Sequence, residues 1–192
     1  MSGLAAIFDM DGVLVDSYRA HFESWLRLYT ELGVDYSEAA FAADFGRTSR
    51  DILRRAFGEK LTDAQIRDMD QRKEAYYRDI IRRDFPAMEG ATELIDALAA
   101  DGFLLAVGSS GPSENIALSL EKLARADKFA AVVTGSDVTR GKPDPQVFQL
   151  AAERLGVPPS SCVVVEDAPH GVEAARRARM KAIALTGTTT RD

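Results

Sequence analysis

Two aspartates at the end of an apolar run have the residue type and spacing for chemistry. Leu4 to Phe8 is unbroken apolar sequence, and Asp9 and Asp11 follow it directly. Because side chains alternate along a strand, an extended segment would point both carboxylates the same way, and Gly12 would let the chain turn sharply. Two such charges need compensation. The pattern predicts a divalent cation, a shared proton or phosphoryl chemistry, although a plain Asp/Gly-rich turn fits it equally well.

Polar residues also follow three later apolar segments. They are Gly108-Ser109-Ser110-Gly111-Pro112, Gly141-Lys142-Pro143 and Glu166-Asp167. The first is a hydroxyl-rich turn entering a helix, which suits an anion. Each segment alone fits a helix cap, a solvated lysine or turn acids. If all four loops lie at one edge of a sheet, however, they predict a single site.

The elements that position these loops alternate between helix and strand from Ala91 onward. The pattern predicts strands over residues 103–107, 131–134, 162–165 and 181–185, in addition to residues 4–8. It predicts helices that end near Gly102, begin near Ser113, and run over 144–156 and 171–178. Strands joined by crossover helices form a parallel, doubly wound α/β sheet, which binds ligands at the carboxyl ends of its strands.

Residues 17–85 interrupt this alternation with four predicted helices. The pattern predicts helices from Ser17 to Gly33, from Ser37 to Phe45 with Gly46 closing it, from Thr48 to Phe57, and from a capping box at Thr62 to Pro86. No strand-like segment lies among them. We therefore predict a small helical bundle of its own, inserted into a core formed by residues 1–16 and 86–192.

Composition restricts the class of protein. A chain of 192 residues with 46% apolar and 28% charged residues is typical of a globular protein. Its net charge of −6 argues against nucleic acid or an anionic membrane as partner. The single cysteine, Cys162, adjoins three valines and is expected to be a buried strand residue, which fits a reducing cytoplasm. We expect no signal peptide and no membrane span, and nothing requires more than a monomer.

Taken together, the motifs resemble those of the haloacid dehalogenase superfamily of phosphotransferases. The matching stretches are Phe-Asp-Met-Asp-Gly-Val-Leu-Val-Asp-Ser, Gly-Lys-Pro-Asp-Pro and Val-Glu-Asp-Ala-Pro-His-Gly-Val-Glu-Ala-Ala. The branch that matches best is subfamily IA, which contains β-phosphoglucomutase and its phosphatase relatives. The resemblance covers nearly the whole chain. It implies a Rossmann-like three-layer α/β/α core with a parallel sheet, and a helical cap over residues 17–85.

The resemblance also implies a role for each core motif residue. Asp9 would be the nucleophile and Asp11 the general acid and base. A Mg²⁺ ion would be held by the Asp9 carboxylate, the Asp11 carbonyl and Asp167, with Glu166 nearby or bound through water. The phosphoryl oxygens would be bound by Ser109, Ser110 and Lys142. Dehalogenases of the superfamily lack the second aspartate, so its presence favours phosphate esters over haloacids.

Specificity in this branch lies in the cap. His21 and Trp25 lie four residues apart on one predicted helix face and resemble a mutase pattern. Arg47, Arg50 and Lys73 correspond to cations that contact substrate in relatives. Each of these residues fits equally well as a solvated helix charge or, for Trp25, as a residue of the bundle core.

Two departures from the mutase pattern favour hydrolysis. Gly111, Pro112 and Ser113 stand where mutases have Ser, Lys and Asn. The arginine after Gly46 lies one residue late unless Arg47 replaces it. We therefore expect a magnesium-dependent phosphohydrolase acting on a small phosphorylated metabolite, by preference a sugar phosphate. The alternative is a β-phosphoglucomutase-type phosphomutase using a sugar bisphosphate, and a more distant one is a non-catalytic binding module.

Overall fold

The computed structural model describes residues 3–44, 47–58 and 61–186. The chain divides into two compact units, which we describe separately. One comprises residues 18–84, and the other is built from the segments on either side of it. The second unit contains β1 (Ala5–Phe8), α5 (Ala91–Ala100), β2 (Leu104–Gly108), α6 (Ser113–Leu123), β3 (Phe129–Val133), α7 (Gln146–Leu155), β4 (Cys162–Glu166), α8 (Pro169–Arg177) and β5 (Lys181–Ala184).

This α/β unit is built around one parallel sheet. Within the described residues the sheet has five strands in the order β3-β2-β1-β4-β5. Every pair is parallel, and Ala5 of β1 lies opposite Leu104 on one side and Cys162 on the other. All residues of β1 are fully buried, as expected for an apolar strand covered on both faces. The predicted α/β class is confirmed.

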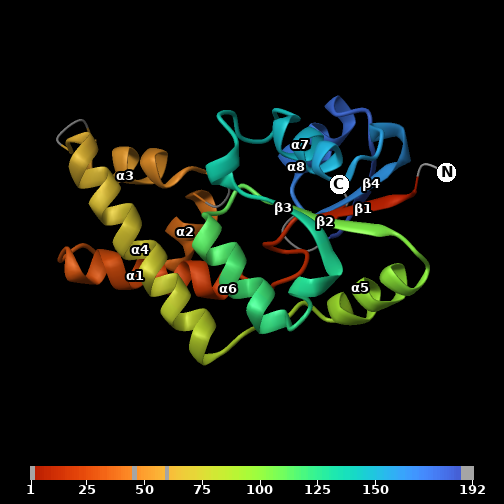
Figure 1. The fold of residues 1–192 in the computed structure, drawn as a ribbon. Helices are drawn as coiled ribbons and strands as arrows, with labels where there is room; N and C mark the ends of the chain where they lie inside the picture. The colour runs from red at the N-terminus through yellow and green to blue at the C-terminus, as the bar shows by residue number, and fades with distance from the viewer. Residues whose placement is uncertain (1–2, 45–46, 59–60, 187–192) are drawn as a thin grey trace. The chain divides into compact units, whose positions relative to one another are not determined.

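Helices cover both faces of the sheet. Figure 1 shows α7 and α8 on one side, with α5 and α6 on the other. Alternation along β1 sends Ala5 and Ile7 into the cluster that packs against α7 and α8, where Phe148 and Ala174 are also buried. The sheet and its two helical layers therefore form the three-layer core that holds the strand ends in place.

Strand and helix boundaries differ slightly from the expected ones. β3 begins at Phe129 rather than residue 131 because Phe129 packs edge-on against Phe8, with ring centroids 6.1 Å apart. α8 begins at Pro169 rather than Gly171, since proline fits the first helical position. Cys162 is buried in β4, as predicted. Among the described helices, none combines the length and the apolar character needed to cross a membrane.

The other unit is a bundle of helices. It contains α1 (Tyr18–Glu31), α2 (Glu38–Asp44), α3 (Ser49–Phe57) and α4 (Asp63–Arg83). Thr62 and Gln65 form the predicted capping box at the start of α4. The predicted end of the second helix at Phe45 and Gly46 lies outside the described residues. Eight buried residues form the core of this unit: Phe22, Trp25, Leu28, Tyr29, Phe41, Ile52, Leu53 and Ile66.

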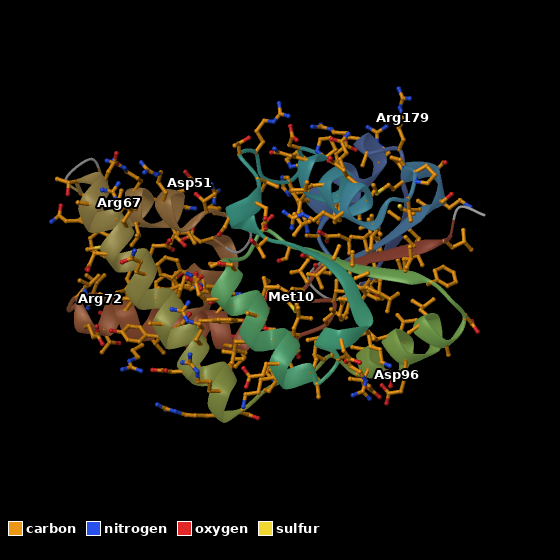
Figure 2. The ribbon with its side chains drawn as sticks, in the orientation of Figure 1. Met10, Asp51, Arg67, Arg72, Asp96 and Arg179 are labelled. Carbon is orange, nitrogen blue, oxygen red and sulfur yellow. The ribbon has the colours of Figure 1, made fainter. Side chains whose placement is uncertain are left out.

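Many charged side chains lie on the outside of each unit. Figure 2 shows Arg67 at the surface of the helical unit and Arg179 at that of the α/β unit, and both residues are exposed. Met10, beside the first candidate aspartate, is 1% exposed. Burial of the Met10 side chain therefore helps to hold the turn after β1 in place.

The two chain segments that enter and leave residues 18–84 are joined to each other within the α/β unit. Val15 forms an antiparallel bridge with Ala87. The Asp16 amide donates to the Pro86 carbonyl at 2.8 Å, and the Met88 amide donates to the Leu14 carbonyl at 3.0 Å. The α/β unit thus closes on itself at the point where the chain leaves it.

Candidate active site

The first loop is a tight turn that begins where β1 ends. The Asp9 amide still donates to Val165 of β4, at 3.0 Å, but the turn that follows is closed by a 2.8 Å hydrogen bond from Gly12 N to the Val15 carbonyl. Gly12 has a φ of +72°, which favours glycine, and a Cβ there would lie 2.2 Å from Asp167 Oδ2. Asp11 is therefore positioned by this turn, and the strand alternation used to predict its direction stops at Phe8.

Lys142 joins the first, third and fourth loops. Its Nζ lies 3.0 Å from Asp9 Oδ1 and 2.7 Å from Glu166 Oε1, and its side chain is 9% exposed. The ammonium group also lies over the Phe148 ring, 4.9 Å from the centroid. A buried cation between two carboxylates is far less screened by water than a surface one. The first, third and fourth loops therefore lie together, as the sequence predicts.

Glu166 is the most deeply buried acid of the site. Its side chain is fully buried, and Oε2 accepts a 2.6 Å hydrogen bond from the Ala168 amide. Gly171 of α8 makes room for it, because a Cβ on that residue would lie 1.6 Å from Glu166 Oε1. With Lys142 on the other oxygen, both Glu166 oxygens already have partners.

The second loop brings a buried hydroxyl group to the same edge. Ser109 is 1% exposed, and its Oγ accepts from the Gly111 amide at 3.2 Å. A Cβ on Gly111 would lie 3.5 Å from that Oγ and 3.9 Å from Asp11 Oδ2. Ser110, in contrast, is exposed, and its backbone rather than its side chain packs against Gly135. Ser109 is therefore the better placed of the two predicted serines.

The charges in this cluster shift one another's pKa values. Burial raises the pKa of Asp9 from 3.8 to about 7; Lys142 opposes that rise, and the neighbouring Glu166 and Asp11 add to it. Burial alone would lower the pKa of Lys142, but the Asp9 and Glu166 carboxylates outweigh it, so the net shift is upward. Lys142 is therefore a fixed cation, whereas Asp9 needs further positive charge to stay ionised at neutral pH.

The residues present fit a magnesium ion. Carboxylate oxygens of Asp9, Glu166 and Asp167 all lie within 4.8 Å of one another. Asp9 Oδ1 is buried and, apart from its ion pair with Lys142, accepts no well-aligned hydrogen bond from any residue that the structure describes. Such hard oxygen donors suit Mg²⁺. Both Glu166 oxygens already have partners, so a metal ion would meet Glu166 only by displacing one of them or through a bridging water.

Three of the predicted cap residues lie together in the helical unit. Lys73 Nζ lies 2.9 Å from His21 Nδ1 and 5.6 Å from the centroid of the Trp25 ring. Trp25 is 3% exposed and belongs to the hydrophobic core of the bundle. Two residues that the sequence analysis missed complete the group: Glu74 Oε1 accepts from Lys73 at 2.8 Å, and the Tyr77 ring stacks on His21 with centroids 4.3 Å apart.

The two predicted cap arginines lie elsewhere in that unit, beside acids. Arg47 Nε is 3.7 Å from Asp44 Oδ1, and Arg50 Nη1 is 2.9 Å from Asp63 Oδ1. Both arginine side chains are 52% exposed. Neither arginine joins the buried group around Lys73 in the contacts observed.

Comparison with known proteins finds similar sequences and structures that match nearly the whole chain. A family model described as haloacid dehalogenase-like hydrolase matches residues 6–185. Validoxylamine A 7′-phosphate phosphatase from Streptomyces hygroscopicus subsp. limoneus is 32% identical over 95% of this chain and 85% of its own. Beta-phosphoglucomutase from Bacillus subtilis is 31% identical over 94% and 82%. A solved β-phosphoglucomutase from Clostridium difficile is 25% identical, with a TM-score of 0.84 over 95% of this chain and 84% of that one.

Proposed function

Because the chain belongs to the haloacid dehalogenase-like hydrolase family, we propose that it is a magnesium-dependent phosphatase acting through an aspartyl-phosphate. The observation that carries the proposal is the environment of Asp9. This buried carboxylate lies beside a buried ammonium group, Lys142, and within reach of the acids that fit a metal ion. Phosphoryl transfer depends mainly on positioning and on neutralising charge, which such an arrangement supplies.

In this proposal a carboxylate oxygen of Asp9 attacks phosphorus and forms an O–P bond while the P–O bond to the substrate breaks. The leaving oxygen takes its proton from Asp11. Water then attacks the phosphorus and gives a proton to Asp11 while the P–O bond to Asp9 breaks, which releases phosphate and regenerates the Asp9 carboxylate. Ser109 and Lys142 bind the phosphoryl oxygens throughout. When bound, Mg²⁺ would offset the negative charge that Asp9 and the phosphoryl group bring together.

The substrate we propose is a sugar-like phosphate monoester, with helical residues 18–84 as its cap. The relatives reported above support this class, because one is named a validoxylamine A 7′-phosphate phosphatase and the other a beta-phosphoglucomutase. Hydrolysis is favoured over a mutase by the charges of the helical unit. The buried ammonium group of Lys73 is already neutralised by Glu74, with side chains 4% and 11% exposed. A second phosphate at Lys73 would have to displace that carboxylate.

A phosphorus NMR time course tests the proposal. We would follow β-glucose 1-phosphate with Mg²⁺ and a trace of glucose 1,6-bisphosphate, then a panel of hexose and pentose phosphates. Release of inorganic phosphate is the expected result. Glucose 6-phosphate formation without phosphate release would instead establish the mutase.

Two matched variants tie the activity to the site. Asp9→Asn should reduce hydrolysis by at least about a thousandfold, since it removes the nucleophile and a metal ligand. Asp101→Asn makes the same chemical change at an exposed residue at the end of α5 and should leave the rate unchanged. Full activity in the Asp9 variant would refute the mechanism.

A further inference from the structure

Gln146, a residue outside the motifs, helps to hold the loop that carries Lys142. Gln146 is the first residue of α7, and its Oε1 accepts from the Thr139 and Arg140 amides, both at 3.0 Å. These are two consecutive backbone donors just before Gly141 and Lys142. Residues 139–141 are exposed and therefore have no buried side chains to fix them.

Around this contact, Gln146 is itself fixed in place. Its own amide donates to Asp144 Oδ1 at 3.0 Å, and the Asp144 amide donates to the Gly141 carbonyl at 3.0 Å. The loop therefore closes on the start of α7 from both sides of Lys142. On the same first turns of α7, buried Phe148 supports the Lys142 ammonium group. One short helix segment thus sets both the backbone and the charged end of Lys142.

From this geometry we infer that Gln146 is a positioning residue for Lys142. The Gln146 amide oxygen fixes the backbone before Lys142. The Lys142 side chain is thereby held in the conformation that reaches Asp9 Oδ1 and Glu166 Oε1. The inference rests on the proposed function for its effect on catalysis, but the contact itself is independent of it. An error of about 1 Å in the position of a catalytic group can cost a hundredfold in rate.

Three single variants separate positioning from a general effect on α7. Gln146→Ala removes the acceptor and should lower kcat by about ten- to a hundredfold, with KM much less affected. Gln146→Glu keeps an oxygen at the same place and should retain most of the activity. Gln149→Ala makes the same truncation at an exposed position of the same helix and should behave as the wild type.

A double-mutant cycle with Lys142→Met then asks whether Gln146 acts through Lys142. If it does, adding Gln146→Ala to Lys142→Met should reduce the residual rate by less than about twofold. Amide hydrogen exchange in the peptide covering residues 138–142 should accelerate in Gln146→Ala but not in Gln146→Glu. Equal rate losses in both backgrounds, or unchanged exchange in Gln146→Ala, would overturn the inference.

The cycle remains decisive if the proposed function is wrong. Should the wild-type protein hydrolyse no phosphate ester, the same four proteins can be compared by urea unfolding instead. Gln146→Ala should then change the unfolding equilibrium constant several-fold more with Lys142 present than in Lys142→Met. Identical changes in the two backgrounds would refute positioning without reference to activity.

Discussion

Replacing Gly171 by alanine tests how tightly α8 packs on the buried acid of the site. A Cβ there would lie 1.6 Å from Glu166 Oε1 and 2.0 Å from its Cδ, so both groups cannot keep their places. Glu166 is fully buried and accepts hydrogen bonds from Lys142 and from the Ala168 amide. The substitution should therefore move Glu166 and break both contacts.

The magnitude follows from two opposing effects. Each hydrogen bond to a charged group contributes about 1.5–3 kcal/mol, so losing two costs about 3–6 kcal/mol. Gly171 lies in a helix, where alanine is favoured over glycine by about 1 kcal/mol. The net expectation is a loss of about 2–5 kcal/mol in the free energy of unfolding, measured by urea denaturation.

The same substitution in a Glu166→Ala background serves as the control. With the long side chain gone, nothing beyond Cβ of residue 166 remains to clash, and only the helix preference of alanine is left. Gly171→Ala should then stabilise the protein by up to about 1 kcal/mol relative to Glu166→Ala alone. If it destabilises both backgrounds equally, the steric argument is wrong.

Three further outcomes can be measured. The folded-state pKa of Asp9 is raised to about 7, so the stabilisation from its protonation is full below about pH 4 and is lost as pH rises through 7. The gain in Tm on adding Mg²⁺ should therefore be larger at pH 8 than at pH 6. Asp137 shows the opposite pH dependence, because Arg154 and Thr134 lower its pKa to about 2. Its contribution to stability is present above about pH 4 and is lost toward pH 2. Asp137→Asn should therefore flatten the acid limb of a plot of Tm against pH. Thr62→Ala, which removes the capping box of α4, should cost about 1 kcal/mol in urea unfolding, and no loss would exclude a role for that cap in stability.

Much of the α/β unit could be predicted because its signals are local. Apolar runs, capping residues and the rule that parallel strands present their carboxyl ends at one edge sufficed to predict that Lys142 and Glu166 would lie near Asp9. Alternation along a strand does not explain the position of Asp11, because the strand ends at Phe8. The turn closed by Gly12 sets that position.

What the sequence did not reveal depends on contacts between distant segments. Phe148 supports Lys142 because α7 packs on β1 and β2, which no local pattern encodes. Glu74 sits beside Lys73 in sequence, but nothing there shows that both side chains are buried. The acceptor role of Gln146 depends on the path of the loop before it, which forms only in the folded protein.

The hydrogen-bonded crossing at Val15 and Ala87 has a consequence for biosynthesis. The central strand β1 is made before residues 18–84, yet its neighbours β2 and β4 are made only after those residues have been completed. Those residues form a compact unit that is continuous in sequence, and such units generally fold as they are synthesised. Meanwhile β1 remains an unpaired apolar segment with both edges exposed, which is the kind of segment that molecular chaperones shield and that aggregates when translation stalls. The order in which the chain is made therefore leaves the strand that leads to the proposed nucleophile unpaired while residues 18–84 are synthesised.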